Sequence, residues 1–72
     1  MNKLFEVTAD RKTGEWINVR EAGEMQWDEY CGKIDDENTH WDHADSIMSI
    51  DGKEYLHGPD GANVIVKMTF AD

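Results

Sequence analysis

Residues 47–57, IMSIDGKEYLH, contain the pattern that decides most of the fold. The dipeptide Asp51-Gly52 separates two runs rich in apolar and aromatic side chains. Both loop positions of a type I′ turn have positive φ, which aspartate and glycine tolerate, so this dipeptide predicts a β-hairpin with a two-residue loop. The register of such a loop pairs Ile50 with Lys53. It also places three large apolar side chains on one face of the hairpin, namely Met48, Ile50 and Tyr55.

A further strand is predicted after this hairpin. Residues 58–61, Gly-Pro-Asp-Gly, have the composition of a turn. Residues 63–70 then alternate in a way that is typical of a half-buried strand. The side chains expected on its apolar side are those of Val64, Val66, Met68 and Phe70.

Two alternating segments near the N-terminus predict another hairpin. Residues 3–9 and 15–21 each have a period of two, and the residues between them favour a loop longer than two residues. In the second segment the alternation sets Ile17 and Val19 on the inner face and Trp16 on the opposite, outer face. An exposed tryptophan is a common anchor at protein interfaces, so Trp16 is a candidate partner contact. The alternative is that Trp16 packs beneath the helix from the other face.

The middle of the chain changes to a helical period. Trp27, Tyr30, Cys31 and Ile34 lie at i, i+3, i+4 and i+7, which predicts an amphipathic helix packed on the sheet. Gly32 lies within this stripe and disfavours a helix interior, so the helix could end there.

A second, shorter helical turn is expected after a loop at residues 35–38. Thr39 can cap it, with Asp42 at the third position beyond, as in a capping box. Trp41, Ala44 and Met48 would share its inner face. The expected fold class is α+β: a small, mostly antiparallel sheet in the order β-β-α-β-β-β, with a short acidic helix and loop packed on it. Residues 1–72 are expected to form a single domain.

Negative charge is concentrated in one part of the chain. The sequence has sixteen acidic and seven basic residues, a net charge of −9. Residues 21–45 contain nine of the acids and one base, Lys33, whereas the rest of the chain is nearly neutral. Such a field repels nucleic acids and anionic membranes and attracts basic surfaces. The nine acids are Glu21, Glu24, Asp28, Glu29, Asp35, Asp36, Glu37, Asp42 and Asp45.

This distribution predicts a basic protein surface as the partner, and a nucleic-acid-binding protein in particular. Duplex DNA presents one phosphate charge per roughly 1.7 Å of its axis, and an acidic surface can occupy the same basic groove. The nine acids and Trp16 are therefore the predicted contact residues of a small inhibitor that mimics DNA. In size, charge and lack of a catalytic motif the chain resembles the small inhibitors that bacteriophages direct against host nucleases, CRISPR complexes or RNA polymerase. This is a likeness of class, so it assigns no role to any residue.

Two other functions are consistent with the sequence. In the first, the chain is a structural or regulatory interaction module that uses exposed Trp16 and Tyr55 more than the acids. In the second, His40 and His43, which lie at i, i+3 and would share a face of a helix, bind a metal such as zinc. Paired cysteines, which structural zinc sites favour, are absent from the sequence.

No catalytic motif is found, so the chain is expected not to be an enzyme and to need no cofactor. The single cysteine, Cys31, cannot form an internal disulfide and is expected to be a buried, inert thiol. The N-terminal residues lack the apolar run of a signal peptide, and the longest aliphatic run is Val64-Ile65-Val66. A cytoplasmic location is therefore expected.

Overall fold

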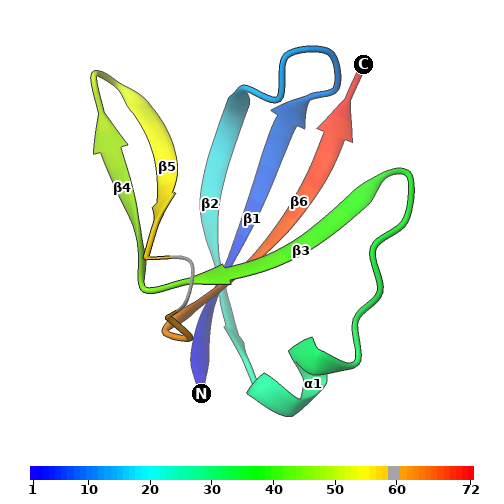
Figure 1. The fold of residues 1–72 in the computed structure, drawn as a ribbon, viewed down its shortest axis with the longest axis vertical. Helices are drawn as coiled ribbons and strands as arrows, with labels where there is room; N and C mark the ends of the chain where they lie inside the picture. Colours follow the sequence, from blue (N-terminus) through cyan, green and yellow to red (C-terminus); the bar gives the residue numbers. More distant parts are fainter. Residues whose placement is uncertain (59–60) are drawn as a thin grey trace.

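The computed structural model describes residues 1–58 and 61–72, which form a small sheet-rich domain with one short helix (Figure 1). The elements in chain order are β1 (Asn2–Asp10), β2 (Trp16–Met25), α1 (Trp27–Cys31), β3 (Thr39–Ala44), β4 (Ser46–Ile50), β5 (Lys53–His57) and β6 (Val64–Ala71). The predicted turn at residues 58–61 includes Pro59 and Asp60, which lie outside the described residues.

The strands form a four-stranded sheet in the order β2-β1-β6-β3 and a separate two-stranded sheet of β4 and β5. The pairs β1–β2 and β3–β6 are antiparallel, but the central pair β1–β6 is parallel. The main sheet is therefore mixed, with the expected antiparallel pairing at β1–β2 and β3–β6 and one parallel pair, β1–β6, that the sequence did not predict. The parallel pair arises because the chain passes through the helix, β3 and the hairpin before β6 enters the sheet beside β1, and parallel neighbours need such a long connection.

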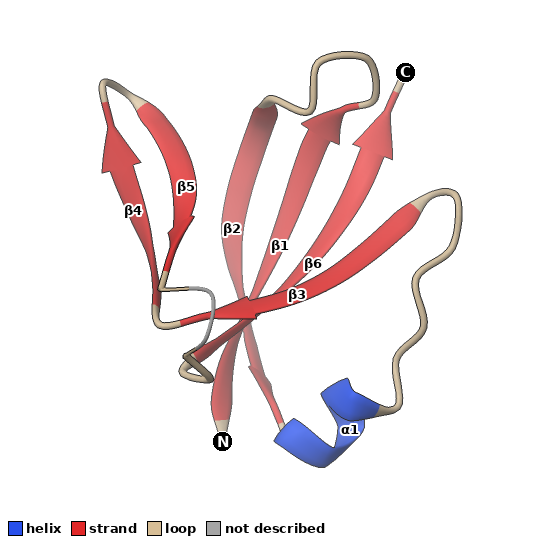
Figure 2. Ribbon diagram, viewed as in Figure 1, coloured by secondary structure: helices blue, strands red, loops and turns tan. Residues whose placement is uncertain are grey.

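Strand β6 forms the centre of the core. Val64, Ile65 and Val66 are all buried, with exposed fractions of 6%, 0% and 0%, so both faces of this strand are covered. A continuous apolar run is typical of such a strand. Val64 lies beside Ile47 and Glu54, so the face that carries Val64 and Val66 is toward the β4–β5 hairpin. Ile65 pairs with His43, whose ring contacts Tyr30, so the opposite face is toward α1. Figure 2 shows the hairpin and the helix at separate places beside the main sheet.

The predicted β4–β5 hairpin is confirmed, including its register. Asp51 and Gly52 have φ angles of 53° and 80°, as a type I′ turn requires. Ile50 pairs with Lys53, and Met48 pairs with Tyr55. Met48, Ile50 and Tyr55, which share one face of the hairpin as predicted, are all exposed.

The predicted helix exists but is shorter than its apolar stripe. α1 ends at Cys31, and Gly32 follows it as the C-cap residue. The side chains of Trp27 and Tyr30 are half-buried, whereas Cys31 and Ile34 are exposed. The expectation of a buried Cys31 was therefore wrong. The helix stops because glycine disfavours continuation and only its first turn has a packing partner.

The second helical turn, expected to begin at Thr39, was wrong, because residues 39–44 form β3. Asp36 Oδ1 accepts hydrogen bonds from the backbone N–H groups of Asn38 and Thr39, at 2.7 and 2.8 Å. This local turn directs the chain into pairing with β6, and ladder hydrogen bonds replace those of a helix. Successive side chains of β3 consequently point to opposite faces of the sheet, so Trp41 and Ala44 do not share a face.

A β-bulge in β2 reverses the predicted orientation of Trp16. Thr8 pairs with Asn18, but Ala9 pairs with Trp16, which leaves Ile17 as an extra residue. Directly paired residues of antiparallel strands lie on the same face, so Trp16 shares the face of Ala9. Ile17, predicted to point inward, is 62% exposed.

Candidate protein-binding site

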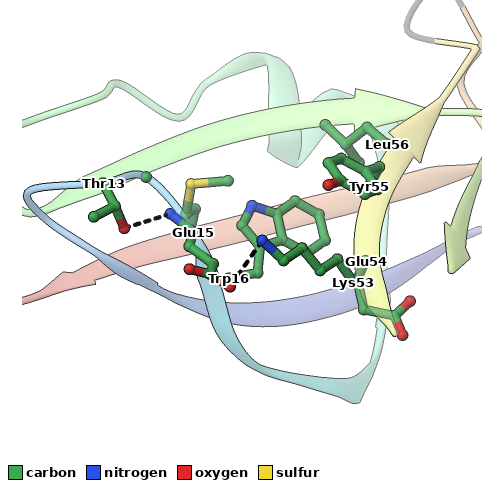
Figure 3. Close-up of a pocket in the computed structure, with 9 residues that line it drawn as sticks. Thr13, Glu15, Trp16, Lys53, Glu54, Tyr55 and Leu56 are labelled. Atoms are coloured by element: carbon green, nitrogen blue, oxygen red, sulfur yellow. Dashed lines mark hydrogen bonds and ion pairs between the residues drawn. The ribbon is translucent and has the colours of Figure 1, made fainter. Parts of the chain in front are cut away.

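A groove lies between the four-stranded sheet and the β4–β5 hairpin (Figure 3). Its volume is about 490 Å³. Two of its lining residues, Trp16 and Tyr55, are the aromatic residues that the sequence suggested for an interaction module. We call it the aromatic groove, and its lining consists of Thr13, Gly14, Glu15, Trp16, Lys53, Glu54, Tyr55, Leu56 and Met68.

The apolar part of the aromatic groove is built from three strands. The bulge at Ile17 brings Trp16 onto the face of the sheet toward the hairpin, and the register of β1 and β6 puts Met68 on that face too. Leu56 comes from the half-buried face of β5. Tyr55 is 47% exposed. Aromatic and thioether side chains of this kind offer large contact surfaces to a partner.

The rim of the groove is a turn held by hydrogen bonds. Asp10 Oδ1 accepts from the backbone N–H groups of Lys12 and Thr13, at 2.8 and 2.9 Å. These two bonds, that of Thr13 first, lower the pKa of the Asp10 carboxyl below its usual value. The backbone N–H of Glu15 donates to Thr13 Oγ1 at 3.1 Å. Gly14, with φ of 76°, lets the chain turn back into β2.

An ion pair connects this rim to the hairpin. Lys53 Nζ on β5 lies 3.3 Å from Glu15 Oε1, and both side chains are more than half exposed. Figure 3 shows the lysine side chain extending from β5 toward the glutamate beside the Trp16 ring. The pair therefore lies at the groove and faces solvent.

The nine predicted acidic contact residues are divided among several parts of the fold. Five of them lie on α1 and the loop that follows it, and all five are exposed. Lys33 is the basic residue of this segment, and its Nζ lies 3.9 Å from Glu29. We call this set the anionic edge, and it consists of Asp28, Glu29, Asp35, Asp36 and Glu37.

The other four acids do not join the anionic edge. Glu21 and Glu24 lie on β2, which is the outer strand at the opposite side of the sheet from β3. Asp42 is on β3 beside His40, with its Oδ2 at 3.7 Å from Nε2 of that ring. The carboxylate of Asp45 lies against the backbone of residues 58 and 61, where a Cβ would collide with it. The structure thus does not gather the nine acids into one surface.

His40 and His43, which the alternative metal-binding function placed on one helical face, lie three residues apart on strand β3. Their side chains therefore point to opposite faces of the sheet. His40 Nδ1 contacts the carboxylate of Asp35, and His43 Nδ1 lies 2.9 Å from the Tyr30 hydroxyl. Among residues 1–58 and 61–72, no group of three or more histidine, cysteine or acidic side chains could hold a metal ion.

The comparisons with known proteins found no match. No protein-family model, no curated protein and no solved structure matches this chain. Within the part of the chain that the structure describes, no helix has the length and apolar character needed to cross a membrane.

Sequence reasoning identified Trp16 and Tyr55 but missed that they line the same groove. Nothing in the sequence distinguishes four other lining residues from ordinary strand and turn residues, namely Glu15, Lys53, Leu56 and Met68. Their meeting depends on how the hairpin folds back over the main sheet, which no local pattern specifies.

Proposed function

We propose that this chain is a protein-interaction module that binds its partner through the aromatic groove. The observation that carries this proposal is that Trp16 and Tyr55, from β2 and β5, line one open groove of about 490 Å³. Tryptophan and tyrosine are enriched among the residues that contribute most to protein interfaces. A partner side chain that enters the groove would bury apolar surface against both sides of the fold.

The net charge of the chain indicates what kind of partner it attracts. The net charge of −9 favours encounter with a basic protein and disfavours direct contact with nucleic acids. We therefore expect a partner whose surface is basic around the segment that enters the groove.

A second candidate function is the electrostatic inhibitor of a nucleic-acid-handling protein. It is favoured by the anionic edge, where five exposed carboxylates occur within residues 28–37 beside one base, Lys33. Such an edge could occupy part of a surface that otherwise grips phosphates. Because four of the nine acids lie elsewhere, this version depends on a shorter row of charge than the sequence suggested.

The two functions differ in which substitutions abolish binding. The immobilised full chain is used to capture its partner from a cell extract, and the captured protein is then bound to purified variants. Tyr55→Ser removes one aromatic lining residue of the groove, and Ile17→Ser is its matched control, because Ile17 is exposed and outside the groove. The interaction module predicts that Tyr55→Ser loses binding and Ile17→Ser does not.

The anionic edge is tested with two charge reversals that change the net charge equally. Asp28→Lys with Glu37→Lys alters the anionic edge, whereas Glu21→Lys with Glu24→Lys alters two acids of strand β2, outside that edge. Loss of partner binding with the first pair alone supports the inhibitor. Equal loss of binding with both pairs indicates only long-range attraction. If neither Tyr55→Ser nor the edge variant weakens binding, both proposed functions are wrong.

A further inference from the structure

We infer that the aromatic groove recognises a cationic side chain of the partner, and an arginine in particular, which replaces Lys53 at Glu15. This inference rests on the proposed function, because it names the chemical class of the group that the groove takes. It comes from the arrangement of one carboxylate, one displaceable lysine and two aromatic rings around the same space.

The carboxylate of Glu15 belongs to a residue whose backbone is held in place. Its N–H donates to Thr13 Oγ1 at 3.1 Å, and its carbonyl oxygen accepts from the backbone N–H of Asp10 at 2.8 Å. Trp16 follows directly in the chain and lines the same groove. A negative group and an aromatic ring are thus presented side by side by a turn with its own hydrogen bonds.

Lys53 occupies the position that a partner cation would take. Its Nζ lies 3.3 Å from Glu15, and the two side chains are 57% and 54% exposed. Exposed ion pairs of this kind contribute little to stability, so another cation can displace the lysine at small cost. The lysine would then turn toward solvent, where its charge is hydrated.

Arginine fits these groups better than lysine does. A guanidinium is planar, binds a carboxylate with two parallel N–H donors and stacks on aromatic rings. The aromatic side chains of Trp16 and Tyr55 are available for such contacts. Figure 3 shows the Glu54 carboxylate directed away from Trp16, so Glu15 is the carboxylate that would receive the partner cation.

The test uses the full-length chain, labelled with nitrogen-15, and the indole N–H signals of its three tryptophans. N-acetyl-arginine-N-methylamide is titrated at constant ionic strength, with N-acetyl-norleucine-N-methylamide as the uncharged probe. We expect the arginine probe to shift the Trp16 signal and to leave that of Trp41 unchanged. Trp41 is an internal control, because Lys33 and Lys67 lie 5.2 and 5.7 Å from the centre of its ring and would repel a cation.

Two variants test the exchange of cations at Glu15. Glu15→Gln is expected to weaken binding of the arginine probe by roughly threefold, the size of effect typical of exposed charge pairs. Lys53→Met keeps an unbranched side chain but removes the competing charge. It is therefore expected to strengthen binding of the arginine probe by roughly threefold. Circular dichroism of both variants checks that the fold is retained.

The inference is overturned if the norleucine probe shifts Trp16 as strongly as the arginine probe, because the groove would then be an apolar site. It is also overturned if neither probe shifts Trp16, or if Lys53→Met leaves the arginine probe unaffected. These results are independent of the partner. If Tyr55→Ser still abolishes capture of the partner, the interaction module stands and only the cationic occupant is wrong.

Discussion

The hydroxyl of Tyr30 on α1 lies 2.9 Å from Nδ1 of His43 on β3. The ring of His43 is also in edge contact with Trp27, with ring centres 5.1 Å apart. Burial is the main cause that raises the pKa of the Tyr30 hydroxyl, followed by the negative charges of Asp42 and Asp35. The hydrogen bond and the ring contacts together hold a five-residue helix that is too short to be stable alone.

Replacing Tyr30 by phenylalanine is therefore expected to destabilise the fold. The substitution keeps the ring but removes the hydroxyl, and loss of one such bond typically costs about 1 kcal/mol. In a domain of this size that corresponds to a fall in Tm of about 4–8 °C. Thermal unfolding followed by circular dichroism measures it, and Tyr55→Phe is the control on an exposed ring. Equal Tm values for the two variants would contradict the role assigned to the Tyr30 hydroxyl.

The bulge in β2 gives opposite expectations for two adjacent residues. Trp16 is half-buried on the face toward the hairpin, so Trp16→Ala should destabilise the fold by about 2 kcal/mol, less than for a fully buried tryptophan. Ile17 is 62% exposed, and Ile17→Ala should change the stability by less than about 0.5 kcal/mol. Urea unfolding monitored by circular dichroism compares the two. If Ile17→Ala lost more stability than Trp16→Ala, Ile17 would be the inward-facing residue, as simple alternation predicts, and the bulge would be wrong.

Local patterns in this sequence predicted those elements whose geometry is set within a few residues. The type I′ turn at Asp51-Gly52 fixed its own hairpin register, and Gly32 marked the end of the helix. The bulge at Ile17 was not predictable, because one extra residue in a strand leaves no distinct composition but reverses every side chain beyond it. The prediction of a helical turn beginning at Thr39 was wrong for a related reason. Pairing with β6, which is distant in the sequence, outweighed a local capping signal.

The candidate site was predictable only in its parts. Trp16 and Tyr55 were identified from residue type, but their meeting depends on the bulge and on the docking of the β4–β5 hairpin. The acidic segment was identified from composition, yet its residues are divided among β2, α1 with the loop that follows it, and β3. Charge density along a sequence becomes one surface only when the fold keeps that segment on one side.

We expect the free energy of unfolding to fall at low pH, because the carboxylate of Asp35 becomes protonated. The backbone N–H of Trp41 donates to it at 2.8 Å, and this bond, followed by that from His40, lowers the pKa of Asp35. A carboxyl whose folded pKa is below its unfolded pKa adds stability above the unfolded value, about 3.9, and loses it as the pH falls toward the folded value. Asp35→Asn should therefore reduce stability at pH 6 and flatten its dependence on pH between 5 and 2. Urea unfolding across this range measures both, and an unchanged slope would contradict the role of Asp35.

Gly23 and Gly32 provide a matched test of backbone conformation. Gly23 has φ of 102°, and a Cβ placed there would meet no atom within 4 Å, so any cost of Gly23→Ala comes from the backbone alone. We expect a loss of about 1–2 kcal/mol, because residues with a side chain rarely adopt this conformation. Gly32 has φ of −87°, and its Cβ would make an ordinary contact at 3.5 Å with the carbonyl oxygen of Glu29. Gly32→Ala should therefore be neutral or stabilise by up to about 1 kcal/mol, because alanine restricts the unfolded chain. Equal unfolding midpoints in urea for the two variants would show that β2 does not require the positive φ at Gly23.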